Sequence, residues 1–269
     1  PIAGLFAVIA ATAVSVVCAQ LSIKTRQLVF VLSGLLLVGL TGYLPYKTVT
    51  TFNFNERAFI AKFSVLANEM KRSNDVNFSV AIPTIGVFGY ELIGHDIIDM
   101  LGLADSAVAR HGEPPIPGME TTWKEKRHNS VYILKRSPDY IIFSTGAKPS
   151  APAERALMQY PQFLESYRLT AWFVQSKEFN PRGSLAAAFK RVHPVEGVIT
   201  PTYPLDFVEY YKKGQDALVA GDNPAATAAL TKSLAALGNR PPWPELLWAI
   251  GTSLMNQKNP RGIEYWDQA

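Results

Sequence analysis

The densest group of side chains able to do chemistry lies in one short stretch, at Glu91, His95, Asp96 and Asp99. Carboxylates and imidazoles hold metal ions or transfer protons, so this stretch is a candidate metal or sugar site. The same residue types also cap turns and end strands, and their spacing matches no established metal-ligand motif. We therefore expect mainly structural roles for these residues.

Other catalytic patterns are missing from the sequence. The remaining histidines, His111, His128 and His193, form no HxxxH, HExxH or Cys/His spacing. Residues 86–89 (GVFG) lack the pattern of a phosphate-binding loop, and no GxSxG nucleophile motif is present. We expect no catalytic residue, no metal ion and no cofactor.

Large aromatic side chains recur in the last part of the chain, at Tyr210, Tyr211, Trp243 and Trp248. Tyrosine and tryptophan are enriched in protein interfaces because they combine a large apolar surface with one polar group. We name these residues as candidate contacts to a partner protein, with core packing as the alternative interpretation.

Two long stretches without charge open the sequence, over residues 1–23 and 27–46. A bilayer core about 30 Å thick needs roughly 20 mainly apolar residues in a spanning helix, and both stretches meet that length. Backbone groups in lipid must be satisfied internally, so the stretches should be helical. The sequence therefore predicts a transmembrane helical hairpin over residues 1–46.

A signal peptide and a buried hairpin in a soluble core are the alternatives to this membrane hairpin. A signal peptide carries basic residues ahead of a shorter apolar core, whereas nothing basic precedes the first stretch. The lack of an initiator Met at Pro1 indicates a trimmed start. Two adjacent uncharged stretches of this length are rare in soluble cores, so we expect an anchor in a bacterial inner membrane.

Positive charge predicts the orientation of the hairpin. Lys24 and Arg26 lie in the expected loop between the stretches, residues 22–27, and the positive-inside rule places that loop in the cytoplasm. Residues 47–269 and the N-terminus are then expected in the periplasm. The net charge of +4 is modest and spread along the chain, so membrane lipid is an expected partner and nucleic acid is not.

Residues 76–200 alternate between strand and helix patterns, after a connecting amphipathic helix within residues 47–75. Asn55 is the expected N-cap of that connecting helix. The alternation predicts an α/β sandwich with a sheet that is at least partly parallel. Apolar and β-branched runs predict strands at 76–83, 95–103, 138–145, 167–174 and 184–192, and helical periodicity predicts helices at 55–72, 123–136 and 153–165.

Residues 201–269 change to an all-helical pattern. Two amphipathic helices are predicted within residues 205–237, and a third over residues 244–257. The placement of small and large residues around Gly214 resembles a tetratricopeptide unit, and a second copy begins near Gly251. Such units need roughly three copies for independent stability, so this module must lean on the α/β domain or on a partner.

Residues 82–112 resemble a motif in the exported C-terminal domains of GT-C membrane glycosyltransferases, especially the arabinofuranosyltransferase-like bacterial branch. In that branch a strand and a glycine turn lead to a D-x-x-G-L-x-D element and then to an H-G pair. The matching residues here are Asp99, Gly102, Leu103, Asp105, His111 and Gly112. The resemblance covers roughly residues 28–175 and implies an exported α/β domain next to the final membrane helices.

The sequence departs from that family where catalysis is concerned. GT-C enzymes have many membrane helices, use a polyprenyl-phosphate sugar donor and carry their catalytic carboxylate in the first exported loop. The one loop between the two predicted membrane helices contains no acidic residue, so nothing here matches that position. The catalytic N-terminal half of such an enzyme is absent from this sequence.

These observations favour a non-catalytic, membrane-anchored periplasmic subunit that binds other membrane-protein subunits of a larger bacterial complex. Photosynthetic, respiratory and envelope assemblies are all candidates for that complex. The alternative is the C-terminal fragment of a GT-C glycosyltransferase, and a weaker third hypothesis is a periplasmic glycan-binding module.

Overall fold

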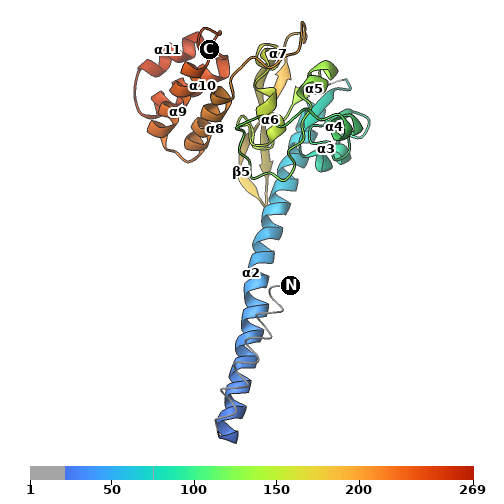
Figure 1. The fold of residues 1–269 in the computed structure, drawn as a ribbon, viewed down its shortest axis with the longest axis vertical. Coiled ribbons are helices and arrows are strands. Elements are labelled where there is room, and N and C mark those ends of the chain that lie inside the picture. The colour runs from blue at the N-terminus through green and yellow to red at the C-terminus, as the bar shows by residue number, and fades with distance from the viewer. Residues whose placement is uncertain (1–21, 75) are drawn as a thin grey trace. The chain divides into compact units, whose positions relative to one another are not determined.

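The computed structural model describes residues 22–74 and 76–269 and divides the chain into two units at Phe59 and Ile60. The first predicted membrane helix falls on residues 1–21, outside the described part of the chain. Among the described residues, the chain is a mixed α/β protein with a single five-stranded sheet (Figure 1).

Helix α2 runs from Ile23 to Arg72. Its segment Ile23–Gly42 is long and apolar enough to cross a membrane, and none of it is buried by other parts of the chain. Length and composition of this kind also occur in signal sequences, so they establish an apolar helix near the N-terminus and no more.

The structure corrects two boundaries around α2. Lys24 and Arg26 lie in the first turn of the helix and not in a loop, because the Ser22 hydroxyl accepts a hydrogen bond from the Thr25 N–H and starts the helix there. Asn55 is not an N-cap, because it lies inside α2. The helix continues through residues 47–54, which contain neither glycine nor proline to end it.

The sheet has the strand order β2-β1-β3-β5-β4. Strand β1 pairs in parallel with β2 and β3, whereas β5 is antiparallel to both β3 and β4. The predicted, partly parallel sheet is therefore confirmed. The strands are β1 (Ser79–Ile82), β2 (Asp96–Asp99), β3 (Tyr140–Ile141), β4 (Tyr167–Ser176) and β5 (Asn180–Arg191).

Short helices connect and cover the strands, and two of the predicted helices differ from the observed ones. The helix expected over residues 123–136 begins only at Ser130, because the Asn129 side chain caps it by accepting from the Tyr132 N–H. The helix expected over residues 153–165 is two helices, because Pro161 cannot continue the first one. The observed helices are α3 (Ile85–Glu91), α4 (Ser106–Arg110), α5 (Ser130–Arg136), α6 (Pro152–Leu157) and α7 (Pro161–Ser166).

Alternate residues of the strands supply two buried clusters, one on each face of the sheet. Val80 and Tyr140 join the cluster that also contains Phe63 from the end of α2. Ala81 and Phe189 belong to the other cluster, which takes in residues from α4 to α10. The sheet is therefore covered on both faces by helices.

Four helices complete the described chain. Helices α8 to α10 follow the prediction closely, with the turn between α8 and α9 at Gly221, whose φ of 76° suits glycine. The fourth, α11, was not expected from the sequence. Their bounds are α8 (Leu205–Val219), α9 (Asn223–Ala236), α10 (Pro244–Asn256) and α11 (Arg261–Gln268).

These C-terminal helices pack onto the same core as the sheet. The Trp243 ring, just before α10, lies 6.1 Å from the ring of Phe189 on β5 and 5.1 Å from that of Tyr211 on α8. The Glu245 carboxylate on α10 accepts a hydrogen bond of 2.9 Å from the Leu169 N–H on β4. Apolar stacking and one polar contact thus fix α8 and α10 against β4 and β5.

Candidate functional site

Two members of the polar cluster predicted from the sequence join secondary-structure elements. The Glu91 carboxylate, at the end of α3, accepts hydrogen bonds from the side chains of Ser64 and Asn68 on α2. The His95 ring accepts from the Phe78 N–H at 3.2 Å and lies 4.2 Å from the Phe78 ring. Glu91 therefore joins α3 to α2, and His95 joins the turn before β2 to the residue that precedes β1.

The other two members of the cluster have different partners. Asp96 forms an ion pair with Arg136 on α5. Asp99 is buried and accepts from the N–H groups of Leu101 (2.9 Å) and Ala104 (2.6 Å), which closes the turn after β2. The structure does not gather the cluster into one site, and no group of three or more His, Cys, Asp or Glu in the described chain is placed to hold a metal ion.

The D-x-x-G-L-x-D element builds the connection between β2 and α4. Gly102 has a φ of 74°, and a Cβ there would lie 2.7 Å from the Ala109 backbone nitrogen, so only glycine fits. Asp105 caps α4 by accepting from the Ala107 N–H at 2.8 Å and also accepts from the Tyr132 hydroxyl at 3.0 Å. These contacts give the element a role in folding.

The predicted partner contacts divide into buried and exposed residues. Tyr211 and Trp243 are only 1% and 2% exposed, so they are core residues and the prediction is wrong for both. Tyr210 is partly exposed, with the amines of Lys213 and Lys232 5.4 and 5.7 Å from its ring centre. Trp248 is 54% exposed and is free to contact a partner.

Trp248 borders an apolar groove of about 550 Å³, here called the β4–α10 groove. Apolar side chains make up most of its surface, with Arg168 and Glu245 as its charged members. The sheet contributes Leu169, Ala171, Leu185 and Ala187, and the helices contribute Trp248 and Trp266.

The register of β4 and β5 explains why apolar side chains line this groove. Three opposed pairs follow each other on one face of the sheet: Leu169 with Phe189, Ala171 with Ala187, and Phe173 with Leu185. The first pair lies under the Trp243 stack, but the helices do not reach the last, so Leu185 is 72% and Phe173 58% exposed. An apolar row therefore runs from the core into solvent.

The groove also lies beside an open sheet edge, because β4 is the outermost strand. The Leu169 N–H points away from β5 and is satisfied by Glu245. Since alternate residues of an edge strand direct their backbone groups outward, those of Ala171 and Phe173 face the same side. Burial raises the pKa of Glu245, and the hydrogen bond from Leu169 only partly offsets this.

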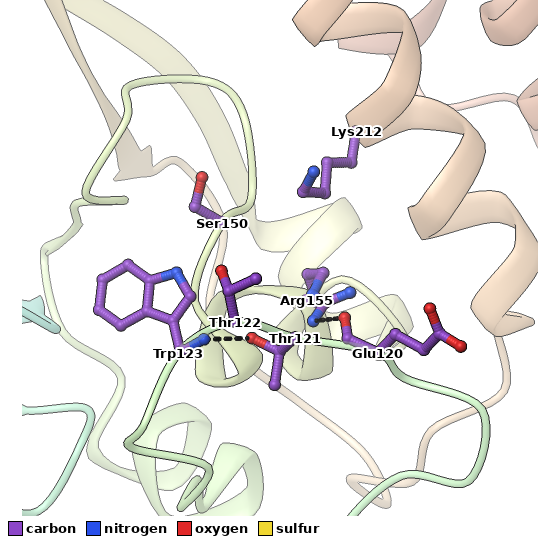
Figure 2. A pocket seen from close by; sticks show the side chains of 7 residues that line it. All are labelled: Glu120, Thr121, Thr122, Trp123, Ser150, Arg155 and Lys212. Carbon is purple, nitrogen blue, oxygen red and sulfur yellow. Dashed lines mark hydrogen bonds between the residues drawn. The ribbon is translucent and has the colours of Figure 1, made fainter. Parts of the chain in front are cut away.

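A second, polar pocket of about 460 Å³ lies between the segment before α5, the start of α6 and helix α8 (Figure 2). The Arg155 guanidinium is 2% exposed; it forms an ion pair with Glu209 and donates to the Glu120 carbonyl at 2.7 Å. The residues around the pocket are Glu120, Thr121, Thr122, Trp123, Ser150, Arg155 and Lys212.

The loop that carries Ser150 into this pocket is held by one buried carboxyl group, that of Glu154. It accepts hydrogen bonds from the N–H and hydroxyl of Ser144 and from the N–H groups of Ser150 and Ala151. Burial raises the pKa of Glu154, and these hydrogen bonds act in the opposite direction. Hydrogen bonds to Glu154 therefore hold the loop that contributes Ser150 to the pocket.

Sequence reasoning missed most residues of the groove and the pocket. Leu185 could have been found, because Leu185, Ala187 and Phe189 alternate along a predicted strand and their shared face needs a cover. Arg155 and Lys212 carry no such signal: they are far apart in sequence and meet only through the packing of α8 on α6.

Comparison with known proteins gives one match. No curated protein and no solved structure matches the chain. The profile of one family, described as a domain of unknown function (DUF8728), matches residues 56–193, just over half of the chain, from within α2 to the end of β5. The chain therefore belongs to the DUF8728 family.

Proposed function

We propose that this chain is a non-catalytic, membrane-anchored subunit that binds and stabilises a larger bacterial membrane complex, photosynthetic, respiratory or of the cell envelope. The observation that carries the proposal is the β4–α10 groove, in which exposed leucine and tryptophan side chains lie beside an open strand. Apolar grooves bordered by tryptophan are typical of surfaces that bind other proteins.

The backbone of β4 adds a second means of binding. An edge strand offers unpaired N–H and C=O groups to an extended segment of another chain, and the apolar side chains beside it select the segment. Trp248 is the expected anchor, because a large and partly exposed ring can bury much apolar surface against a partner.

We infer that α8 to α11 are two tetratricopeptide-like helix pairs that frame the groove. A Cβ on Gly214 would lie 2.5 Å from the Leu230 side chain, and one on Gly251 would lie 2.8 Å from the Gly262 carbonyl oxygen. In both pairs, therefore, a glycine on the first helix lets the second helix approach closely. Two such pairs are fewer than the roughly three that stand alone, which fits their packing on the sheet.

The apolar segment Ile23–Gly42 supplies the proposed membrane anchor. Lys24 and Arg26, at its start, favour a cytoplasmic location of that end under the positive-inside rule. The residues after the anchor, including the groove, would then face the periplasm. Membrane lipid and neighbouring membrane-protein subunits are the expected partners.

Co-purification tests this function. The tagged full chain is extracted from its native membranes in mild detergent, alongside Trp248→Ala, Leu185→Asp and a control, Val219→Asp, whose side chain is 84% exposed outside the groove. Wild type and control should retain the same membrane-protein partners. The groove variants should retain roughly thirtyfold less of these partners, since truncating an anchor residue weakens the binding free energy by about 2 kcal/mol. A monomeric wild-type chain would contradict the proposal.

The alternative function is that of a C-terminal part of a GT-C glycosyltransferase. The resemblance of residues 82–112 to the exported domains of those enzymes is the basis of this alternative. In the described chain, no group of three or more His, Cys, Asp or Glu is placed to hold a metal ion. The sequence of the full gene distinguishes the two functions, because about ten further membrane helices encoded upstream would exclude the subunit hypothesis.

A further inference from the structure

The polar pocket has properties that protein binding at the groove does not use. Segments far apart in sequence converge on it: residues 120–123, Ser150 ahead of α6, Arg155 on α6 and Lys212 on α8 (Figure 2). It lies apart from the groove, and the two share no lining residue. A function assigned to one therefore does not imply a function for the other.

The charges around the pocket leave positive charge on its α8 side. Lys148 and Lys212 both pair with Asp216, at 2.6 and 3.0 Å, so two amines share one carboxylate. Burial alone would raise the pKa of Asp216, but the hydrogen bonds from the two lysines outweigh it and lower that pKa. With Asp216 ionised, these three groups carry one positive charge in excess, while the exposed Glu120 adds one negative charge to the lining of the pocket.

Arg155 adds a buried donor to the same wall. Its two terminal nitrogens are taken up by Glu209 and by the Glu120 carbonyl, while its buried Nε has no hydrogen-bond acceptor in the described part of the chain. A buried N–H without an acceptor is unfavourable, so a ligand oxygen that reached it would be stabilised there.

The remaining wall suits the uncharged part of a ligand. Trp123 is half-buried and packs partly against the core, and it lines the pocket together with Thr122 and Ser150 (Figure 2). An indole face binds flat or ring-shaped groups, and hydroxyls supply adaptable hydrogen bonds. The pocket thus combines a cationic wall with an aromatic one.

We propose that this pocket binds a small organic anion with a ring, whose phosphate or carboxylate group pairs with Lys212 while the ring lies against Trp123. The cavity of about 460 Å³ is in the size range of pockets for small molecules. Sugar phosphates and aromatic phosphates share this chemistry, and the experiment separates them.

Calorimetric titration of the full chain in detergent tests the site with four probes: glucose 6-phosphate, phenyl phosphate, glucose and inorganic phosphate. Binding of one phosphate ester or both, with a Kd below about 1 mM, supports the proposal and identifies the ring. Glucose should bind at least tenfold more weakly, because it cannot pair with Lys212. No binding by either ester, or equal binding of inorganic phosphate and both esters, would overturn it.

Variants separate a binding role from a structural one. Lys212→Gln should weaken binding of the preferred ester about tenfold, whereas Lys213→Gln, at the neighbouring exposed position outside the pocket, should not. Trp123→Ala should abolish the preference for an ester over inorganic phosphate, and Trp123→Phe should restore it. Melting temperatures of all variants confirm folding, and unchanged affinity in a folded Lys212→Gln protein would contradict the proposed pairing.

Discussion

At the scale of single residues, several buried or half-buried carboxylates organise turns and the starts of helices. Asp99 closes the turn after β2, Asp105 starts α4, and Glu154 shapes the loop before α6. Each accepts from backbone N–H groups that would otherwise be unpaired. Because these carboxylates bind backbone N–H groups, the acidic residues near residue 99 form no metal cluster in the described chain.

Glu154→Gln is expected to destabilise the folded chain. One side-chain oxygen becomes an NH₂ group that faces N–H donors of Ser144 or of Ser150 and Ala151, so a buried repulsive contact replaces hydrogen bonds. The expected loss is about 2 kcal/mol, or a fall of roughly 4–8 °C in melting temperature. Glu165→Gln, on the surface, is the control. Equal melting temperatures for the two variants would contradict this role of Glu154.

Asp139→Asn is expected to make stability less dependent on acid pH. Burial alone would raise the pKa of Asp139, but hydrogen bonds from Ser79 and Arg191 lower it below its ordinary value of 3.8. A carboxyl group whose pKa is lowered in the folded state stabilises the fold at pH values above its ordinary pKa. This stabilisation is lost as the pH falls through the lowered pKa.

The difference between wild type and Asp139→Asn should therefore be about 1 kcal/mol at pH 7 and shrink below pH ~4, because the partly exposed ion pair is screened by solvent. Thermal unfolding between pH 7 and pH 3 measures it, with the exposed Asp267→Asn as control. A difference that grows toward acid pH would have the wrong sign.

At the scale of elements, glycines determine how closely the C-terminal helices pack. A Cβ on Gly251 of α10 would lie 2.4 Å from the Trp266 ring and 2.8 Å from the Gly262 backbone oxygen, both on α11. Backbone cannot move aside as a flexible side chain can. The position of α11, and with it one side of the groove, therefore depends on a glycine at this position.

Gly251→Ala is expected to destabilise the C-terminal helices by about 2 kcal/mol, despite the better helix propensity of alanine. The matched control is Gly86→Ala in α3, where an added Cβ has no neighbour within 4 Å; it should be neutral or stabilising by up to about 1 kcal/mol. Chemical denaturation compares them. A stabilising Gly251→Ala would show that α11 does not pack as described.

The sequence predicts the type and order of most elements, and the errors have physical causes. Periodicity locates β4, β5 and α8 to α10, because each has a regular buried face. It overestimates the length of β3, which has only two residues. The residues that follow β3 are buried but are not paired as a strand. It misses α11, which is short and follows Pro260 directly.

For the candidate site, the sequence predicts least well which side chains are exposed to solvent. Tyr211 and Trp243 read as surface aromatics by type, yet both lie in the shared core of the sheet and helices. Trp248 is an aromatic residue of the same kind, yet it is exposed, because it lies on the side of α10 that faces away from the core. Only the packing of the helices on β4 and β5 separates these residues, and no local pattern contains that information.

At the scale of the whole molecule, the chain combines an apolar N-terminal helix with a larger folded unit. The folded unit carries two candidate binding sites of different chemistry, the apolar β4–α10 groove and the polar pocket. No metal cluster accompanies them in the described chain.

Membrane topology provides a prediction at this scale. Protease added to spheroplasts should degrade residues 47–269, because Lys24 and Arg26 favour a cytoplasmic start of the apolar helix. A Lys24→Glu, Arg26→Glu variant should lose this uniform orientation. Protection of residues 47–269 until the membrane is permeabilised would reverse the proposed topology, and extraction of the chain by alkaline carbonate would exclude the anchor.

Site-specific photo-cross-linking in native membranes tests the central claim, that the chain acts through contacts made by the β4–α10 groove. A photoreactive residue replaces Leu185 or Trp248 in the groove, or Val219 at a more exposed position outside it. The account predicts the same discrete membrane-protein adducts from both groove positions and none of them from Val219. No adduct from the groove, or an identical pattern from all three positions, would contradict it.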